Sequence, residues 1–219
     1  MKQKLLAEVL GTFVLVFAGT GAVVIDTVMP GSIGHAGIAL TFGLVVLALI
    51  YTFGDISGAH LNPAVTLGFA VAGRFPRALI IPYMVAQVCG ALAASGLLRL
   101  LFPNGGTLGA TLPAGPWWQS FVLEIVLTWF LMQTILSVST GSKEKGITAG
   151  ITVGSVIALE AMFAGPVCGA SMNPARSLSP ALVSGHLADL WIYLTAPCIG
   201  AAIAVPLNRI LRSPETKPS

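Results

Sequence analysis

Two short stretches of this chain, SGAHLNPA at residues 57–64 and GASMNPAR at residues 169–176, share the tripeptide Asn-Pro-Ala. Proline has a fixed φ and no backbone N–H, so it suits the first turn of a helix. Asparagine just before it is a favourable N-cap. The apolar segment after each motif is too short to cross a bilayer, because a spanning helix needs about 20 residues. The two motifs therefore predict half-length helices over about 62–73 and 173–184.

Longer apolar segments flank these half-helices on both sides. Of the 219 residues, 55% are hydrophobic and only 9% are charged, against roughly 25% charged in soluble domains. A surface with so few charges requires lipid as its solvent. The fold class predicted is an all-α membrane protein with two re-entrant half-helices and six transmembrane helices, at about 5–26, 37–54, 79–101, 118–139, 147–165 and 189–211.

The basic residues indicate how the chain is oriented in the membrane. If it crosses six times, only Arg99 and Arg176 of the eleven Lys and Arg residues avoid the side that carries both termini. The positive-inside rule then predicts cytoplasmic termini in a cell membrane, either a plasma or an inner membrane. The net charge of +3 is small and scattered, so no nucleic-acid partner is expected. The residues that gather on the predicted cytoplasmic side are Lys2, Lys4, Arg74, Arg77, Lys143, Lys145, Arg209, Arg212 and Lys217.

The two halves of the chain repeat each other. AEVLGTFVL at residues 7–15 and LEIVLTWFL at residues 123–131 keep Glu and Thr at the same spacing. The whole chain, 1–219, is predicted to be one domain of two repeats, about 5–101 and 118–211. Three spans per repeat invert the second, so the half-helices enter from opposite sides and their N-termini meet near the midplane. Irregular backbone at that depth must be buried in protein or line water, which implies a pore.

With one Asn-Pro-Ala motif in each half of a six-span chain, the sequence from about Ala7 to Arg212 resembles the major intrinsic protein family, the aquaporins and glycerol facilitators. The resemblance implies the hourglass fold, a homotetramer with one pore per subunit, and side-chain amides of the motif asparagines that point into the lumen. The two pore motifs are then Asn62, Pro63, Ala64, Asn173, Pro174 and Ala175. Two facing helix N-termini each place roughly half a positive charge at the centre, and Arg176 adds a full charge near the outer mouth. Such a lumen excludes cations and protons.

In this family four positions form the outer constriction, and their offsets from the motif asparagines place them at Phe42, Ala161, Ala170 and Arg176. Strict water channels typically have Phe, His, a small residue and Arg there, and glycerol facilitators have two large aromatics with Gly and Arg. Two alanines predict a wider, less polar opening. The stretch FAGPVCGASMNPARS at residues 163–177 is most similar to the nodulin-26-like branch, which implies water, glycerol and undissociated arsenous, boric or silicic acid as solutes. A strict water channel is the alternative.

Buried charges within the spans need a role, since ionisable groups in a membrane default to a functional hypothesis. The resemblance gives Glu8 and Glu124 a supporting one, in which each accepts hydrogen bonds from a re-entrant loop. His60 is predicted to steady the inner loop rather than to act as a pH gate. Glu160, beside Ala161, either braces the outer loop or contacts the vestibule.

Two other classes of membrane protein are alternatives to a channel. An ion-coupled transporter can also use inverted repeats and broken helices, and its coupling carboxylate would be one of the glutamates within the spans. A membrane enzyme would need a nucleophile–base pair or a metal cluster, and three dispersed histidines and three cysteines do not supply one. No enzymatic activity, metal or cofactor is therefore expected, and the expected partners are the lipid bilayer, further copies of the chain, and water with small neutral solutes.

Overall fold

The computed structural model describes residues 1–139 and 143–212, with the backbone alone over 143–147, and all secondary structure in this part of the chain is helical. Six helices are long and apolar enough to cross a membrane. They are α1 (Lys2–Val28), α2 (Gly34–Ser57), α4 (Ile80–Leu101), α5 (Trp117–Val138), α6 (Lys143–Cys168) and α8 (Leu190–Arg212). The two short helices are α3 (Pro63–Val71) and α7 (Pro174–Ser184). The fold class is confirmed, and each predicted boundary lies within four residues of the observed one.

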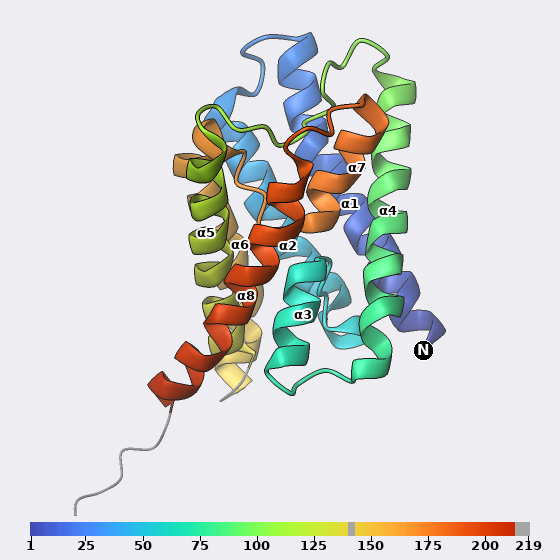
Figure 1. Ribbon diagram of the computed structural model, residues 1–219. Helices are drawn as coiled ribbons and strands as arrows, with labels where there is room; N and C mark the ends of the chain where they lie inside the picture. The colour runs from blue at the N-terminus through green and yellow to red at the C-terminus, as the bar shows by residue number, and fades with distance from the viewer. Residues whose placement is uncertain (140–142, 213–219) are drawn as a thin grey trace, which may run out of the picture.

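The long helices form an upright bundle around the two short ones (Figure 1). Helix α1 begins and α8 ends at the lower end of the bundle in this view. Helix α3 lies in the lower half and α7 in the upper half, so neither crosses the bundle alone. Their N-terminal ends meet in the middle, because Asn62 and Asn173 each hydrogen-bond to the loop before the other helix.

The helix crossings follow the same plan in both halves. Helices α1 and α4 pass so closely that a Cβ atom at Gly90 would lie 3.0 Å from the Phe13 nitrogen. Helices α5 and α8 pass in the same way, with 2.9 Å between a Cβ atom at Gly200 and the Trp129 nitrogen. Small residues permit such backbone approach within lipid. These contacts pair α1 with α5 and α4 with α8 as counterparts in the two repeats.

Helices α2 and α6 are the third pair of counterparts, and they contact each other. A Cβ atom at Gly43 would lie 2.6 Å from the Gly154 carbonyl oxygen, and a Cβ atom at Gly154 would lie 2.6 Å from the Gly43 carbonyl oxygen. This reciprocal contact gives a register between the halves in which Gly43 corresponds to Gly154. By the same offset, Leu49 of α2 corresponds to Glu160 of α6.

The connection between α4 and α5, residues 102–116, crosses the upper end and folds into the molecule. Its Leu108 and Thr111 side chains are buried. The Ala114 nitrogen donates to the Val167 carbonyl at 3.0 Å, which fastens the connection to the end of α6. An uncharged segment suits this position, because a buried charge would need a compensating partner.

Basic residues are distributed unequally between the two ends of the bundle. The lower end carries the start of α1, the connection from α3 to α4, and the last turn of α8, and so it carries Lys2, Lys4, Arg74, Arg77, Arg209 and Arg212. Arg99 lies at the opposite end of α4, and Arg176 lies in α7. The side chains of Lys143 and Lys145, and the whole of Lys217, fall outside the described residues.

Candidate solute pathway

Each short helix begins at the asparagine of its motif. Asn62 has extended backbone angles, and its side-chain oxygen accepts a hydrogen bond from the Ala64 nitrogen at 2.8 Å. Asn173 accepts from the nitrogens of Ala175 and Arg176, at 3.0 and 3.3 Å. A proline occupies the first helical position in both helices, where a missing N–H costs nothing. The local sequence is thus sufficient to start each helix at mid-depth.

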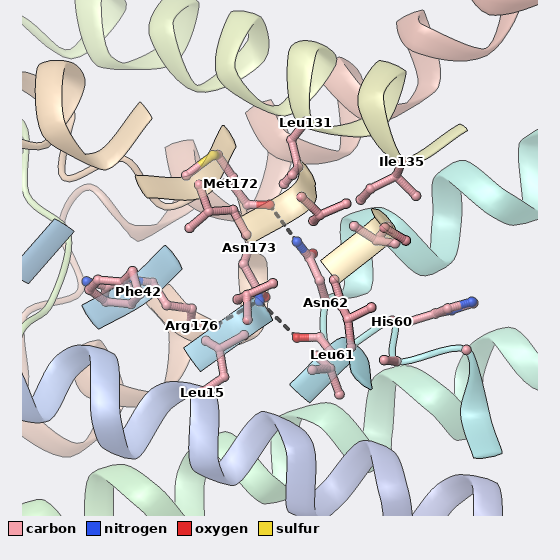
Figure 2. Close-up of a pocket in the computed structure, with 18 of the residues that line it drawn as sticks. Leu15, Phe42, His60, Leu61, Asn62, Leu131, Ile135, Met172, Asn173 and Arg176 are labelled. Carbon is pink, nitrogen blue, oxygen red and sulfur yellow. Dashed lines mark hydrogen bonds between the residues drawn. The ribbon is translucent and has the colours of Figure 1, made fainter. Parts of the chain in front are cut away.

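The two asparagines also tie the halves of the chain together. The Asn62 Nδ2 atom donates to the Met172 carbonyl at 2.8 Å, and the Asn173 Nδ2 atom donates to the Leu61 carbonyl at 2.9 Å (Figure 2). A primary amide has two N–H donors, and each of these bonds uses one. The second N–H of each asparagine is therefore available to a molecule in the space beside it.

The loops that precede the two asparagines have the same unusual backbone. Ala59 and Leu61 have φ values of 46° and 52°, and Ala170 and Met172 have φ values of 42° and 53°. Positive φ is uncommon for residues other than glycine, and it persists only when the surroundings hold it in place. The conformation must therefore be maintained by contacts outside the loops.

Glu8 supplies those contacts for the first loop. Its fully buried carboxylate accepts hydrogen bonds from the backbone nitrogens of His60 and Leu61, at 3.0 and 2.7 Å. The Ser57 hydroxyl and the Gln87 amide each donate to it at 2.7 Å. Four donors are enough to compensate a carboxylate withdrawn from water.

Glu124 holds the second loop with fewer donors. It accepts from the nitrogens of Ser171 and Met172, both at 2.8 Å. The residue three before the crossing glycine is Gln87 in α4, and it is Pro197 in α8. Proline has no hydrogen-bonding side chain, so the amide that supports Glu8 has no equivalent at that position in the second repeat.

A cavity runs beside these loops and is lined from both halves of the chain. Figure 2 shows part of its wall, with Asn62, Asn173, Phe42, Arg176 and His60 around the same space. The wall includes every predicted constriction residue and both motif asparagines. Towards the lower end it includes Val138 and Ser139, at the end of α5. Much of the remaining wall is aliphatic or aromatic, with Leu15, Val46, Ile50, Val65, Phe69, Leu131, Ile135, Val153 and Ile157.

Arg176 is the charged group of this wall, and its position is set by two neighbours. Its Nη1 atom donates to the Gly109 carbonyl at 2.6 Å. Its guanidinium carbon lies 4.9 Å from the centroid of the Phe42 ring, within the range of a cation–π contact. Only 5% of Arg176 is exposed. The guanidinium is thus fixed at the upper part of the cavity, whose wall also includes the small side chains of Ala161 and Ala170.

Several residues that fix the upper connection against the second motif were not predicted from the sequence. Gly109 accepts from Arg176, and the Thr111 and Ser177 hydroxyls are 2.7 Å apart. The Ser171 and Ser177 hydroxyls are 2.5 Å apart, and Ser171 donates to the Asn173 carbonyl at 2.9 Å. Residues 102–116 carry no signal for this role beyond the absence of charge. Gln87 was also missed, although a polar residue within an apolar span is a detectable signal.

Two further predicted residues, His60 and Glu160, differ in whether their polar atoms have hydrogen-bond partners. The His60 Nδ1 atom lies 3.1 Å from the Thr66 hydroxyl. The His60 ring is stacked on Phe69 with centroids 4.8 Å apart, and it contacts Phe75 and Tyr83. Glu160 is fully buried, and neither of its carboxyl oxygens has a hydrogen-bond partner among the described residues. It does not line the cavity shown in Figure 2.

Comparisons with known proteins agree on one family. The model of the family described as major intrinsic protein matches residues 1–207. The chain is 51% identical over 213 residues to aquaporin NIP1-4 of Oryza sativa, covering 96% of this chain and 77% of that protein. It is 47% identical over 211 residues to nodulin-26 of Glycine max, covering 96% and 78%. The solved structure of an aquaglyceroporin from Plasmodium falciparum superposes with a TM-score of 0.86 at 25% identity, covering 96% of this chain and 97% of the other.

Proposed function

The chain belongs to the major intrinsic protein family, and from this premise we propose that it forms a passive channel for water and small neutral solutes that excludes ions and protons. In this channel, residues 1–219 form one domain and the described cavity is its lumen. The observation that carries it is the cavity wall, where both motif asparagines and Arg176 face the same space.

Exclusion of cations follows from the charges around this space. The N-terminal ends of α3 and α7 converge there, and each contributes roughly half a positive charge. The guanidinium of Arg176 adds a full positive charge above them. A neutral molecule has no net charge and is not repelled by this positive potential, whereas a cation or hydronium ion is.

Passage of water depends on the second N–H of each asparagine amide. A water molecule that accepts from Asn62 and Asn173 directs its own two donors away from the asparagines. Its neighbours along the aliphatic wall then cannot donate to it, so a continuous proton wire is broken. The pore motifs in this proposal are residues 62–64 and 173–175, and Glu8, Glu124 and His60 support the loops that hold them.

Selection of the solute is assigned to Phe42, Ala161, Ala170 and Arg176. Two methyl side chains leave more space and less polarity than a histidine or a second aromatic ring. The proposed solutes are water, glycerol and undissociated metalloid acids such as arsenous, boric and silicic acid. Similarity to aquaporin NIP1-4 and nodulin-26 supports a channel for water and small solutes, and structural similarity to an aquaglyceroporin supports glycerol beside water.

The chain is an integral membrane protein, and we assign its lower end to the cytoplasm of a plasma or inner membrane. The basic residues at that end support this orientation. Trp117, Trp118 and Trp191 are exposed near the starts of α5 and α8, at the upper end, where an aromatic belt would meet the outer interface. The proposed assembly is a homotetramer, which rests on family membership.

Stopped-flow light scattering on proteoliposomes tests the channel and its solutes together. Water, glycerol, urea and arsenite permeabilities should exceed those of protein-free liposomes, while a lumenal pH dye reports no added proton flux. Water permeability without glycerol or arsenite permeability would support the strict water channel and refute the wide constriction. Proton flux comparable with solute flux would refute the channel mechanism.

The same vesicles distinguish a channel from an ion-coupled transporter. Channel flux stays linear with solute concentration and is unchanged by a proton or sodium gradient. Saturation together with dependence on a gradient would favour the transporter and direct attention to Glu160, the buried carboxylate without a hydrogen-bond partner in the described chain.

A further inference from the structure

Three arginines from two separate segments come together at the lower end of the bundle. Arg74 follows α3, and Arg209 and Arg212 lie in the last turn of α8. Desolvation, together with the positive charges of Arg212 and Arg209, lowers the pKa of Arg74. The guanidinium of Arg74 is therefore near enough to the other two to be repelled by them, and this cost must be offset by other contacts.

Each guanidinium is held by a backbone carbonyl near a helix C-terminus. Arg74 donates to the Leu136 carbonyl at 3.2 Å, and Arg212 donates to the Ser137 carbonyl at 2.7 Å, both near the end of α5. Arg209 donates to the Val71 carbonyl at 3.3 Å, at the end of α3. Carbonyls at the C-terminal end of a helix carry partial negative charge. These bonds orient three cations over the junction of α3, α5 and α8.

An exposed apolar surface adjoins the arginines. Ile210 and Leu211 are 70% and 74% exposed, and Leu207 and Ile203 are exposed one and two turns further into the span of α8. Val71 is also exposed, at the end of α3. Cationic groups next to a membrane-facing apolar strip match the two parts of a phospholipid, its headgroup and its acyl chains.

We propose that Arg74, Arg209 and Arg212 form a binding site for the phosphate of an anionic phospholipid whose acyl chains lie along α8. Guanidinium groups bind phosphate oxygens through paired N–H donors, and a phosphate offsets the repulsion of Arg74 by Arg209 and Arg212. Basic residues beside the cytoplasmic ends of spans attract anionic lipids. The bound lipid links the re-entrant helix α3 to α5 and α8, so it stabilises the packing of α3 against these two helices.

Lipid binding to the purified full-length chain tests this site without any transport measurement. Native mass spectrometry compares phosphatidylglycerol with phosphatidylcholine of the same acyl chains, and thermal unfolding in detergent is recorded with each lipid. The wild-type chain should retain phosphatidylglycerol preferentially and unfold at a higher temperature with it. Equal binding of the two lipids by the wild-type chain would overturn the proposal, whatever any variant does.

A matched pair of triple variants locates the effect. Arg74→Gln with Arg209→Gln and Arg212→Gln removes the site, and Lys2→Gln with Lys4→Gln and Arg77→Gln removes the same charge from the same end of the bundle. The first should lower the apparent affinity for phosphatidylglycerol by about a hundredfold, given roughly 1 kcal/mol per cation, and the second by much less. Equal losses in both variants would show a general surface charge effect and refute the site.

Inorganic phosphate in detergent without added lipid separates the two sources of the anion. Stabilisation by phosphatidylglycerol but not by millimolar phosphate supports a lipid site. Equal stabilisation by phosphate would refute the lipid as occupant. Because these readouts need no solute flux, failure of the lipid site and failure of the channel proposal are distinguishable.

Discussion

The side-chain amide of Asn62 donates a hydrogen bond to the backbone carbonyl of Met172, 110 residues away, at 2.8 Å. The Asn173 amide donates the equivalent hydrogen bond to the Leu61 carbonyl at 2.9 Å. Each asparagine therefore caps its own helix with the oxygen and holds the opposite loop with the nitrogen. This double use makes the middle of the bundle a unit that neither repeat can form alone.

Replacing Asn62 with alanine removes both bonds at once. The lost N-cap costs about 1 kcal/mol, and the Met172 carbonyl left without a partner costs about 1–3 kcal/mol. The free energy of unfolding should fall by about 2–4 kcal/mol, and water permeability per folded channel should change. Asn208→Ala is the control, because Asn208 is also buried but does not line the cavity. Thermal unfolding and stopped-flow scattering measure the two effects, and unchanged permeability in Asn62→Ala would contradict the prediction.

Replacing Arg176 with valine should raise cation and proton permeability while water permeability is retained. A unit charge within about 4 Å of a passing cation contributes about 1 kcal/mol even at the dielectric constant of water, so the increase should be at least about fivefold. Arg99→Gln removes a charge from the same half of the bundle but away from the cavity, and it should leave permeability unchanged. Proton flux measured with a lumenal dye is the readout. Flux at the wild-type level in Arg176→Val would show that residues other than Arg176 exclude cations.

Replacing Ala161 with phenylalanine should narrow the constriction from the α6 side. Glycerol permeability should fall by about tenfold or more, because pore diameter limits the larger solute first, and water permeability should fall less. Met162→Phe makes a comparable substitution at the next residue, whose side chain is exposed and does not line the cavity. The ratio of glycerol to water permeability is the readout. A ratio that is the same in both variants would remove Ala161 from the constriction.

Replacing a buried polar residue with leucine should lower the free energy of unfolding at Gln87, in the first repeat, but not at Glu160, in the second. Gln87→Leu removes a donor from the buried Glu8 carboxylate and should lower the free energy of unfolding by about 1–3 kcal/mol. Glu160→Leu installs the residue that α2 carries at the corresponding position, Leu49. Since the Glu160 oxygens have no hydrogen-bond partner among the described residues, this change should be neutral or stabilising. Thermal unfolding compares the two, and a large loss of stability in Glu160→Leu would indicate a structural role for that carboxyl.

The six spans and the two half-helices were predictable because their signals are local. Hydropathy over about 20 residues identifies a span whatever its neighbours are, and Asn62-Pro63 or Asn173-Pro174 is enough to start a helix. The inverted arrangement of the halves follows from the number of spans alone. Phe42, Ala161, Ala170 and Arg176 line one cavity, and their role as its constriction stays a prediction from offsets counted along the chain.

Other features depend on which backbones meet, and no local pattern contains that information. Gln87 reaches Glu8 only because Gly90 lets α4 pass against the backbone of α1. Gly109 is a partner of Arg176 only because the uncharged connection of residues 102–116 folds inward. In each case the residue types alone predict that a partner is needed, because a buried charge requires hydrogen-bond donors or acceptors. Which residue becomes that partner is decided by packing between segments far apart in the chain.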